Sequence, residues 1–276
     1  MSLPPSSSPA RIIRLRNGIR SEPIDTLAVE EPLEIRLGYR DQRKGRTHRS
    51  VAITMRTPGD DLALALGFLY SESIISNVGA VRSLEQQGDN VVRIELQDEA
   101  SFDPLRLERN FYVTSSCGVC GKSSLESLSN AGFSALEDNG LRLSLAVLQR
   151  ALLQLADQQP LFRVTGGNHA TALFDTGGAL IHVTEDVGRH NAMDKLVGHC
   201  LQQQLLPLRH HGILVSGRAS FELMQKALAA RCPVLAAVGA PSSLAVELAQ
   251  EYNLTLVGFL GDKGCNIYSG GFRIID

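Results

Sequence analysis

The chain of 276 residues contains no tryptophan, and aromatic residues make up only 5% of it. It has five cysteines, an odd number, and three of them stand singly in the sequence. Such a set argues against a disulfide framework and is typical of a protein from a reducing cytosol. No apolar run approaches the roughly 18 residues that a membrane-spanning helix needs. We therefore expect a cytoplasmic protein with no membrane association.

The chain also lacks a surplus of either charge. Its formal net charge is -2, so there is no overall electrostatic attraction to nucleic acid, and any anion-binding site must be local. Hydrophobic residues make up 43% and charged residues 20%, the balance of an ordinary globular protein. The length allows one large hydrophobic core or two smaller ones.

The first 20 residues are rich in serine and proline and lack the apolar stretch of a signal peptide. We expect a disordered N-terminus over residues 1–20. From Glu34 to Met55, two alternating runs flank a basic loop, which predicts a hairpin. Apolar residues at helical spacing follow Pro58, and "NVVRIELQ" is typical of a strand. These patterns predict a β-rich domain over residues 21–138, ending with a cysteine-containing loop and a helix.

The pattern changes in the remaining part of the chain, residues 139–276. Ser144 is placed to cap the helix "SLAVLQRALLQLADQQ". From about residue 162, short continuous apolar strands alternate with helices, the arrangement of an α/β layer with parallel neighbouring strands. The fold class is therefore mixed, with an α+β N-terminal part and an α/β C-terminal part.

The stretch "SSCGVCGK", residues 115–122, carries Cys117 and Cys120 at a spacing that suits three chemistries. A zinc knuckle would need a second close pair of ligands. The remaining cysteines are single, and the signature of the zinc deaminases is incomplete, so we expect no bound metal. A dithiol oxidoreductase also uses a C-x-x-C that follows a strand.

The third chemistry is that of a sulfur carrier, which needs only one accessible thiol of lowered pKa. Flanking glycines remove bulk and let a partner's sulfur approach. Lys122 and Arg109 could favour the thiolate form electrostatically. The residues of this stretch alone leave the dithiol and sulfur-carrier interpretations open.

Two further patterns could carry chemistry. In "TEDVGRHNAMDKLVG", Asp186, His190 and Asp194 are spaced by four, so on a helix they would share a face, with Lys195 beside them. This indicates either a solvated helix start or a histidine oriented by carboxylates. The paired glycines 166 and 167 indicate, by themselves, only a tight loop.

Polar loops also follow three successive apolar strands. They are "SGRAS", "GAPSS" and "GFLGDKG". Open α/β sheets bind phosphates at the carboxyl ends of their strands, where backbone N–H groups and a guanidinium such as that of Arg218 meet the ligand. Three such loops on neighbouring strands predict a ligand crevice.

Taken in order, these stretches resemble the formate dehydrogenase accessory sulfurtransferase family, the FdhD/NarQ proteins. The resemblance extends over roughly residues 20 to 276. It rests on "RTPGDDLALALGFLYSESII", "SSCGVCGK", "TGGNHATALF", "EDVGRHNAMDKLVG", "SGRASFELMQKA", "GAPSSLAVELA" and "GFLGDKGCNIYSG".

The resemblance implies a sulfurtransferase that accepts persulfide sulfur from a cysteine desulfurase. It would deliver this sulfur to the molybdenum cofactor, bis(molybdopterin guanine dinucleotide), which is bound as a substrate, with no permanent cofactor. The recipient enzyme would be formate dehydrogenase, whose catalytic subunit would be a partner. It further implies a homodimer and a cytidine-deaminase-like three-layer α/β/α domain over residues 139–276.

The resemblance also implies site residues. Cys117 would carry the persulfide and Cys120 would assist transfer. The cofactor-binding segment would consist of Phe259, Leu260, Gly261, Asp262, Lys263 and Gly264. Two alternatives stay open: a chaperone that only binds and hands over the cofactor, and a thioredoxin-like reductase. They differ in whether Cys117 acquires a transferable sulfur.

Overall fold

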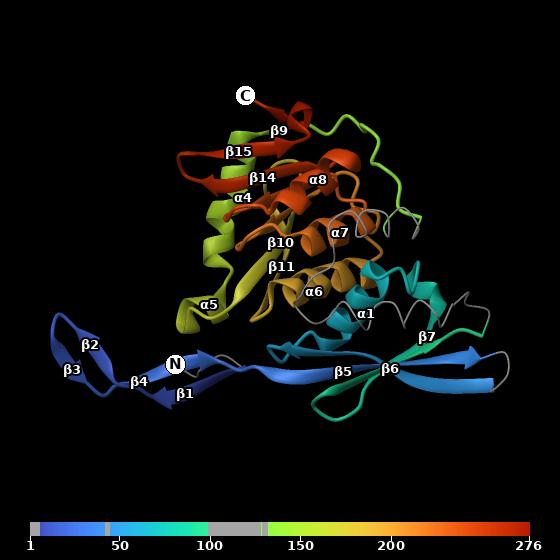
Figure 1. Cartoon of the computed structure of the whole chain (residues 1–276), viewed down its shortest axis with the longest axis horizontal. Helices are drawn as coiled ribbons and strands as arrows, with labels where there is room; N and C mark the ends of the chain where they lie inside the picture. The colour runs from blue at the N-terminus through green and yellow to red at the C-terminus, as the bar shows by residue number, and fades with distance from the viewer. Residues whose placement is uncertain (1–5, 42–44, 99–127, 129–131) are drawn as a thin grey trace.

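The computed structural model describes residues 6–41, 45–98, 128 and 132–276 of the chain (Figure 1). Cys117 and Cys120 lie outside the described residues, as do the sequence-predicted strand before them and, apart from Leu128 and Gly132, the predicted helix after them. Two sheets with helices between and around them make up the body of the molecule. No helix in the described ranges is long and apolar enough to cross a membrane.

The N-terminal sheet is built around a long hairpin, as the sequence predicted. Its strands lie in the order β6-β5-β8-β7, with β5 antiparallel to β6 and parallel to β8. Alternate residues of β5 point to one face, where Leu33, Ile35 and Leu37 are buried against helix α1. The bounds are β5 (Glu31–Asp41), β6 (Gly45–Arg56), α1 (Asp61–Ser71), η1 (Val78–Ala80), β7 (Val81–Gln86) and β8 (Val91–Leu96).

The C-terminal sheet has six strands in the order β11-β10-β12-β13-β14-β15. The three central strands β12, β13 and β14 are parallel, which confirms the prediction from the alternation of apolar strands and helices. The strand bounds are β10 (His169–Phe174), β11 (Leu180–Asp186), β12 (Gly212–Val215), β13 (Val234–Ala237), β14 (Thr255–Gly261) and β15 (Gly264–Ser269).

Helices cover both faces of this sheet. One face packs against α6 (Arg189–Gln202), α7 (Phe221–Ala229) and α8 (Ser243–Glu251), and the other against α4 (Leu145–Asp157). As predicted, the Ser144 hydroxyl caps α4 by accepting from the backbone N–H of Val147. The C-terminal part is thus a three-layer α/β/α arrangement, while its specific likeness to cytidine deaminases stays a prediction. Smaller elements are α5 (Pro160–Thr165), β9 (Leu143–Ser144), η2 (Gly271–Arg273) and β16 (Ile274–Ile275).

Helices α1 and α6 join the two parts at very short range. A Cβ atom on Gly67 would overlap the carbonyl oxygen of Asp194, and one on Gly198 would overlap that of Ala63. Only glycine at both positions lets the two backbones come this close. Helix α1 therefore lies between the N-terminal sheet and α6, and the two parts share a continuous helical layer (Figure 1).

The start of the chain differs from the disordered segment that the sequence predicted. Strands β1 (Ser7–Arg11) and β4 (Ile24–Ala28) pair antiparallel, and β2 (Arg14–Arg16) pairs with β3 (Ile19–Ser21). Asn17 and Gly18 form the turn with positive φ values of 50° and 77°. An Asn-Gly pair is a strong signal for a two-residue hairpin turn, and here it outweighs the Ser/Pro-rich composition.

Part of the segment assigned to the N-terminal domain packs elsewhere. Leu128 and Leu136 are buried in the core beneath α6, α7 and α8. Leu136 also donates its N–H to the carbonyl of Tyr252 at 2.9 Å. Residue 128 and the segment 132–138 therefore belong, by packing, to the C-terminal part.

Candidate functional site

The carboxyl ends of the three parallel strands lie side by side. The N–H of Ser216 donates to the carbonyl of Ala170 at 2.9 Å, and that of Gly239 donates to Gly217 at 2.9 Å. The N–H of Phe259 in turn donates to Gly239 at 3.2 Å. The three polar loops thus follow neighbouring strand ends at one edge of the sheet, and the ligand crevice that the sequence predicted there stays a prediction. We call this edge the strand-end ridge, formed by residues 216–218, 239–242 and 258–264.

Glycines set the spacing along the ridge. A Cβ on Gly239 would lie 3.0 Å from Cα and Cγ of Arg218, so the arginine is packed directly on this glycine. A Cβ on Gly258 would lie 2.9 Å from Pro241 and 3.0 Å from Tyr268. Any larger residue would push the loops apart, so the sequence keeps the ridge narrow and its backbone accessible.

The segment Phe259–Gly264 forms the end of the ridge: it comprises the last residues of β14, the two-residue turn Asp262–Lys263 and the first residue of β15. Phe259 has a positive φ of 52° and its side chain is 53% exposed. Leu260, in contrast, is only 2% exposed and packs into the core under α4. Asp262 and Lys263 are exposed at the turn. The predicted cofactor-binding residues are thus close together, but Leu260 faces away from solvent.

A side chain from helix α4 fixes this turn. The Gln149 amide donates to the carbonyl oxygens of Gly261 at 3.0 Å and of Asp262 at 2.8 Å. These two bonds hold the turn against the helix on the opposite face of the sheet from α7 and α8. The turn is therefore anchored while the Phe259 ring remains available to solvent.

Basic side chains gather beside the ridge, where β10 and α6 begin. The His169 ring packs on Gly217, with Nδ1 3.1 Å from the point that a Cβ there would occupy. Burial lowers the pKa of His169, and the nearby positive charges of Arg189 and Arg218 lower it further. Arg189 Nε is buried with no hydrogen-bond partner among the described residues. We call His169, Arg189, His190 and Arg218 the basic cluster; its charge and its open donor suit an anion.

His190 connects the basic cluster to helix α7. Its Nε2 lies 3.2 Å from Ser220 Oγ and 3.5 Å from a carboxylate oxygen of Glu222. Burial lowers the pKa of His190 to about 4; Glu222 opposes this shift and Arg189 adds to it. The imidazole is therefore neutral at physiological pH and able to accept or donate one hydrogen bond.

A buried ion pair lies behind His190. Lys226 on α7 is 2.9 Å from Asp194 on α6 and 3.5 Å from Glu222, and Ser71 at the end of α1 donates to Asp194 at 3.2 Å. Although burial pulls the pKa of Lys226 down, the charges of Asp194 and Glu222 raise it overall. Charged and polar groups thus run continuously from the site to the junction of α1, α6 and α7.

The prediction that Asp186, His190 and Asp194 share one face of a helix is wrong for Asp186. Strand β11 continues through Asp186, and α6 begins only at Arg189, after Gly188. Lys195 on the helix then pairs with Asp186 at 2.8 Å and donates to the carbonyl oxygen of Thr57 at 2.8 Å. This part of the motif ties the segment after β6 to the C-terminal sheet.

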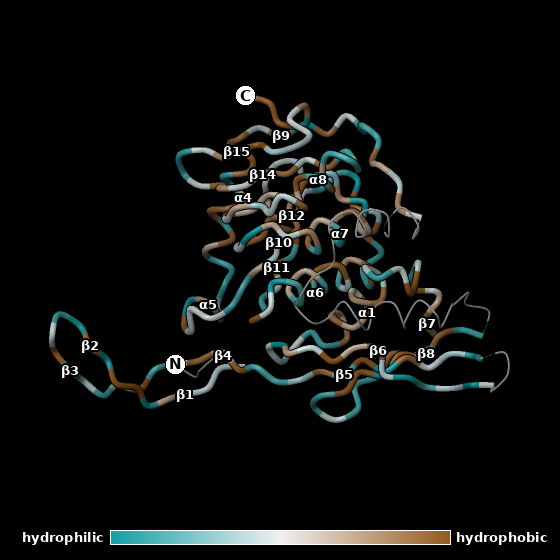
Figure 2. Tube along the Cα trace, in the orientation of Figure 1, coloured by the Kyte–Doolittle hydropathy of each residue, from teal (hydrophilic) through white to brown (hydrophobic). Residues whose placement is uncertain are grey.

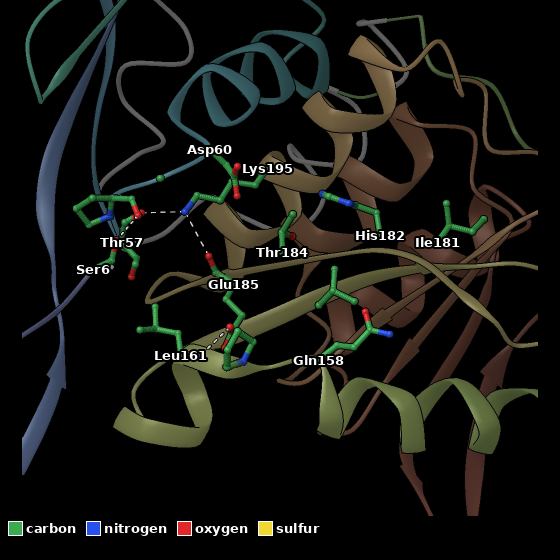
Figure 3. A pocket seen from close by; sticks show the side chains of 14 residues that line it. Ser6, Thr57, Asp60, Gln158, Leu161, Ile181, His182, Thr184, Glu185 and Lys195 are labelled. Carbon is green, nitrogen blue, oxygen red and sulfur yellow. Dashed lines mark hydrogen bonds between the residues drawn. The ribbon is translucent and has the colours of Figure 1, made fainter. Parts of the chain in front are cut away.

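A hollow of about 530 Å³ lies on the other side of the Lys195–Asp186 pair from the basic cluster (Figure 3). Thr57 to Asp60 form one wall and residues 181–185 of β11 form the opposite wall. The Glu185 carboxylate accepts from the first N–H groups of α5, at 3.0 Å from Leu161 and 2.8 Å from Phe162. The Glu185 carboxylate is thus engaged in structure, whereas Arg189 Nε in the basic cluster has no hydrogen-bond partner among the described residues.

The sequence missed His169 and Arg189 as site residues. His169 follows the paired glycines that indicated only a loop, and its contact with Gly217 spans strands far apart in sequence. Among the described residues, no group of three or more histidine, cysteine or acidic side chains is arranged to hold a metal.

This chain is similar to known proteins of one family. The model of the FdhD/NarQ family matches residues 28–275. A sulfur carrier protein FdhD from Streptomyces avermitilis is 47% identical over 96% of this chain and 94% of its own length. One of the same name from Sulfurisphaera tokodaii is 41% identical over 96% of this chain and 98% of its own length.

A solved structure shares the fold. It is a crystal structure of a Desulfotalea psychrophila protein, proposed to be a formate dehydrogenase accessory protein, with a TM-score of 0.77. The alignment covers 98% of this chain and all of the other, at 24% sequence identity. At this identity the likeness extends to the fold alone.

Proposed function

Because this chain belongs to the FdhD/NarQ family, we propose that it is a sulfur carrier that serves formate dehydrogenase. Cys117 accepts persulfide sulfur from a cysteine desulfurase. The sulfur is then delivered to bis(molybdopterin guanine dinucleotide), the cofactor that formate dehydrogenase needs. The observation that carries the proposal is the C-x-x-C within a chain 47% identical, over nearly its whole length, to a protein named a sulfur carrier.

The loading step is a thiol–persulfide exchange. The Cys117 thiolate attacks the outer sulfur of the desulfurase persulfide, a new S–S bond forms on Cys117, and the desulfurase cysteine leaves as a thiolate. No net oxidation occurs, so no further reactant is needed. In this scheme Cys120 assists transfer or release, and the protein acts as a sulfurtransferase.

The cofactor substrate would bind at the strand-end ridge. Each half of it carries a guanine nucleotide with a diphosphate. The exposed ring of Phe259 offers a surface for base stacking, and the turn at Gly261 to Gly264 offers backbone groups. Arg218 and Arg189, whose Nε has no hydrogen-bond partner in the described part of the chain, suit the phosphates, because guanidinium groups bind phosphate oxygens in a bidentate manner.

The proposed cycle also defines the partners. A cysteine desulfurase loads the protein and the catalytic subunit of formate dehydrogenase receives the sulfurated cofactor. We further propose that the protein works in the cytoplasm as a homodimer. The runner-up function, a chaperone that only hands over the cofactor, would need the ridge but no sulfur on Cys117.

The test is the mass of the intact protein after incubation with a cysteine desulfurase and cysteine. We expect the mass of one extra sulfur atom, removed by a reducing thiol, on the wild type and on Cys265→Ser. Cys265 is a suitable control because it is partly exposed beside the ridge. Cys117→Ala should gain no sulfur and should abolish formate dehydrogenase activity in cells. Normal loading of Cys117→Ala would overturn the proposal.

A further inference from the structure

The N-terminal arm, residues 7–28, contacts helix α5 through β4 at its root, and its tip extends away from the body of the molecule (Figure 1). It consists of the ribbon β1–β4 and the hairpin β2–β3, and each is a two-stranded sheet with no third strand among the described residues. Two-stranded ribbons are at best marginally stable by themselves in water. The strand edges of the arm expose unpaired backbone groups, which are suited to packing against another surface.

Large apolar side chains are exposed along the arm. Their exposed fractions are 59% for Ile13, 72% for Leu15, 71% for Ile19, 69% for Ile24 and 48% for Leu27. Hydrophobic segments alternate with hydrophilic ones along this part of the chain (Figure 2). A concentration of apolar groups on so small an element marks an interaction surface.

The arm is also basic. It carries Arg11, Arg14, Arg16 and Arg20 against only Glu22 and Asp25. The two ion pairs within it are long and exposed, at 3.7 Å for Arg14–Asp25 and 3.8 Å for Arg20–Glu22. No carboxylate is paired with Arg16 in the described part of the chain. A partner for the arm should therefore combine apolar surface with negative charge.

Such a surface lies at the root of the arm itself. A hollow of about 430 Å³ is lined by Val29, Pro58, Glu31, Asp60, Asp61, Asp89 and neighbouring residues. We call it the acidic hollow. Asp61 is neutralised there by a bidentate pair with the buried Arg56, at 2.9 and 2.8 Å.

Asp60 and Asp89 leave the acidic hollow negative, while Glu31 lies 3.6 Å from the same Arg56 guanidinium. Asp60 and Asp89 are exposed, and the Glu31 side chain is 44% exposed. Apolar walls from Val29 and Pro58 stand beside them. The acidic hollow thus combines the negative charge and the apolar surface that the arm requires of a partner.

The arm cannot reach its own acidic hollow. From Ala28 to Gly18 the chain extends for ten residues, about 33 Å at the rise of a β-strand, and it leads away from the body. In a dimer with two-fold symmetry, each arm could instead lie in the acidic hollow of the other copy.

We infer that the arm tip of one chain docks into the acidic hollow of a second copy of the same chain, and that this exchange forms a homodimer. This gives the proposed homodimer its interface and does not require the sulfur-carrier chemistry. Arg16 and Arg20 would meet Asp60 and Asp89, while Leu15 and Ile19 would cover apolar surface at the root of the partner's arm.

A charge-exchange experiment tests the docking by sedimentation equilibrium of the full chain. The arm variant is Arg16→Glu with Arg20→Glu, and the hollow variant is Asp60→Asn with Asp89→Lys. Each variant alone should be a monomer at concentrations where the wild type is a dimer, with dimer affinity weakened at least ten-fold. An equimolar mixture should dimerise, because both crossed contacts are then complementary.

The exposed Arg150→Glu on α4 is the matched control and should leave the dimer intact. Thermal unfolding of every variant establishes that it is folded. A monomeric wild type, dimers of either variant alone, or a mixture that stays monomeric would each overturn the docking. Sulfur loading of Cys117 should be unchanged in the arm variant, so failure here is separable from failure of the sulfur-carrier function.

Discussion

Lys226 and Asp194 lie 2.9 Å apart, and their side chains are 1% and 4% exposed. Removing the lysine alone would leave a buried carboxylate without its counter-charge, a change that typically costs about 3–5 kcal/mol. We predict a loss of that size in the free energy of unfolding of Lys226→Met, measured by urea denaturation. The double variant with Asp194→Leu should regain much of the lost free energy of unfolding. A double variant no more stable than Lys226→Met would contradict the prediction.

Because α1 and α6 are in backbone contact, we predict that adding one methyl group at Gly198 destabilises the protein. In Gly198→Ala the new Cβ would overlap the carbonyl oxygen of Ala63, and a backbone atom cannot yield as a side chain can. Overpacking of this kind costs about 1–3 kcal/mol or more. We expect the melting temperature to fall by several degrees. The control Gly177→Ala, whose Cβ would meet only a side-chain oxygen at 3.4 Å, should change it little.

His190 predicts a pH dependence of stability. Its pKa is about 4 in the folded protein because burial disfavours its charged form, against 6.5 ordinarily. The unfolded chain therefore binds a proton more readily, and the stabilising contribution present above pH 6.5 is lost as the pH falls towards 4. Glu222 moderates the shift, while Arg189, Lys226 and His169 reinforce it.

The measurement is the free energy of unfolding between pH 7 and pH 4 for the wild type and His190→Gln. The variant should lose about 2 kcal/mol less over this range, allowing for solvent screening of a side chain that is partly exposed. A direct check is the titration of His190 by NMR. A midpoint near 6.5 would show that this histidine is not the cause.

The position of Arg218 leads to a prediction about guanosine diphosphate, a nucleotide fragment of the proposed cofactor substrate. Guanosine diphosphate should raise the melting temperature by preferential binding to the folded state, and adenosine diphosphate should do so less. Losing a charge-assisted hydrogen bond costs about 1.5–3 kcal/mol, so Arg218→Ala should weaken guanosine diphosphate binding roughly ten-fold or more. Arg82→Ala, an exposed change on the N-terminal sheet, serves as the control.

Sulfur loading of Arg218→Ala shows whether loading and cofactor binding use separate sites or one shared site. If loading and cofactor binding use different surfaces, Arg218→Ala should acquire sulfur on Cys117 as the wild type does. Normal nucleotide binding by this variant would mean that the phosphates bind elsewhere. Loss of loading together with binding would mean that the two steps share one site.

Most of the architecture could be predicted from local patterns. Buried strands such as "GILV" and "VLAA" are apolar throughout because helices cover both faces, and the polar loops after them mark the carboxyl edge of the sheet. The Ser144 cap was visible for the same reason: its signal lies within four residues of the group it bonds. Such local signals also placed the strand-end ridge.

What escaped prediction depends on distant partners. Nothing near Lys195 in the sequence indicates that its ammonium group reaches the carbonyl of Thr57, 138 positions away. The same holds for His169 on Gly217. The hairpin at Asn17 is a different case, because its turn signal was local and was outweighed in the prediction by the serines and prolines around it.

The glycine contact between α1 and α6 has a mechanical consequence. Two helices that touch backbone to backbone, with a buried ion pair beside them, cannot slide or swing without opening a void in the interior. We therefore expect no hinge closure of the N-terminal and C-terminal parts around a bound ligand. In the proposed function, transfer of sulfur or cofactor would therefore depend on movements of the loops and not on a change in the relative positions of the two parts.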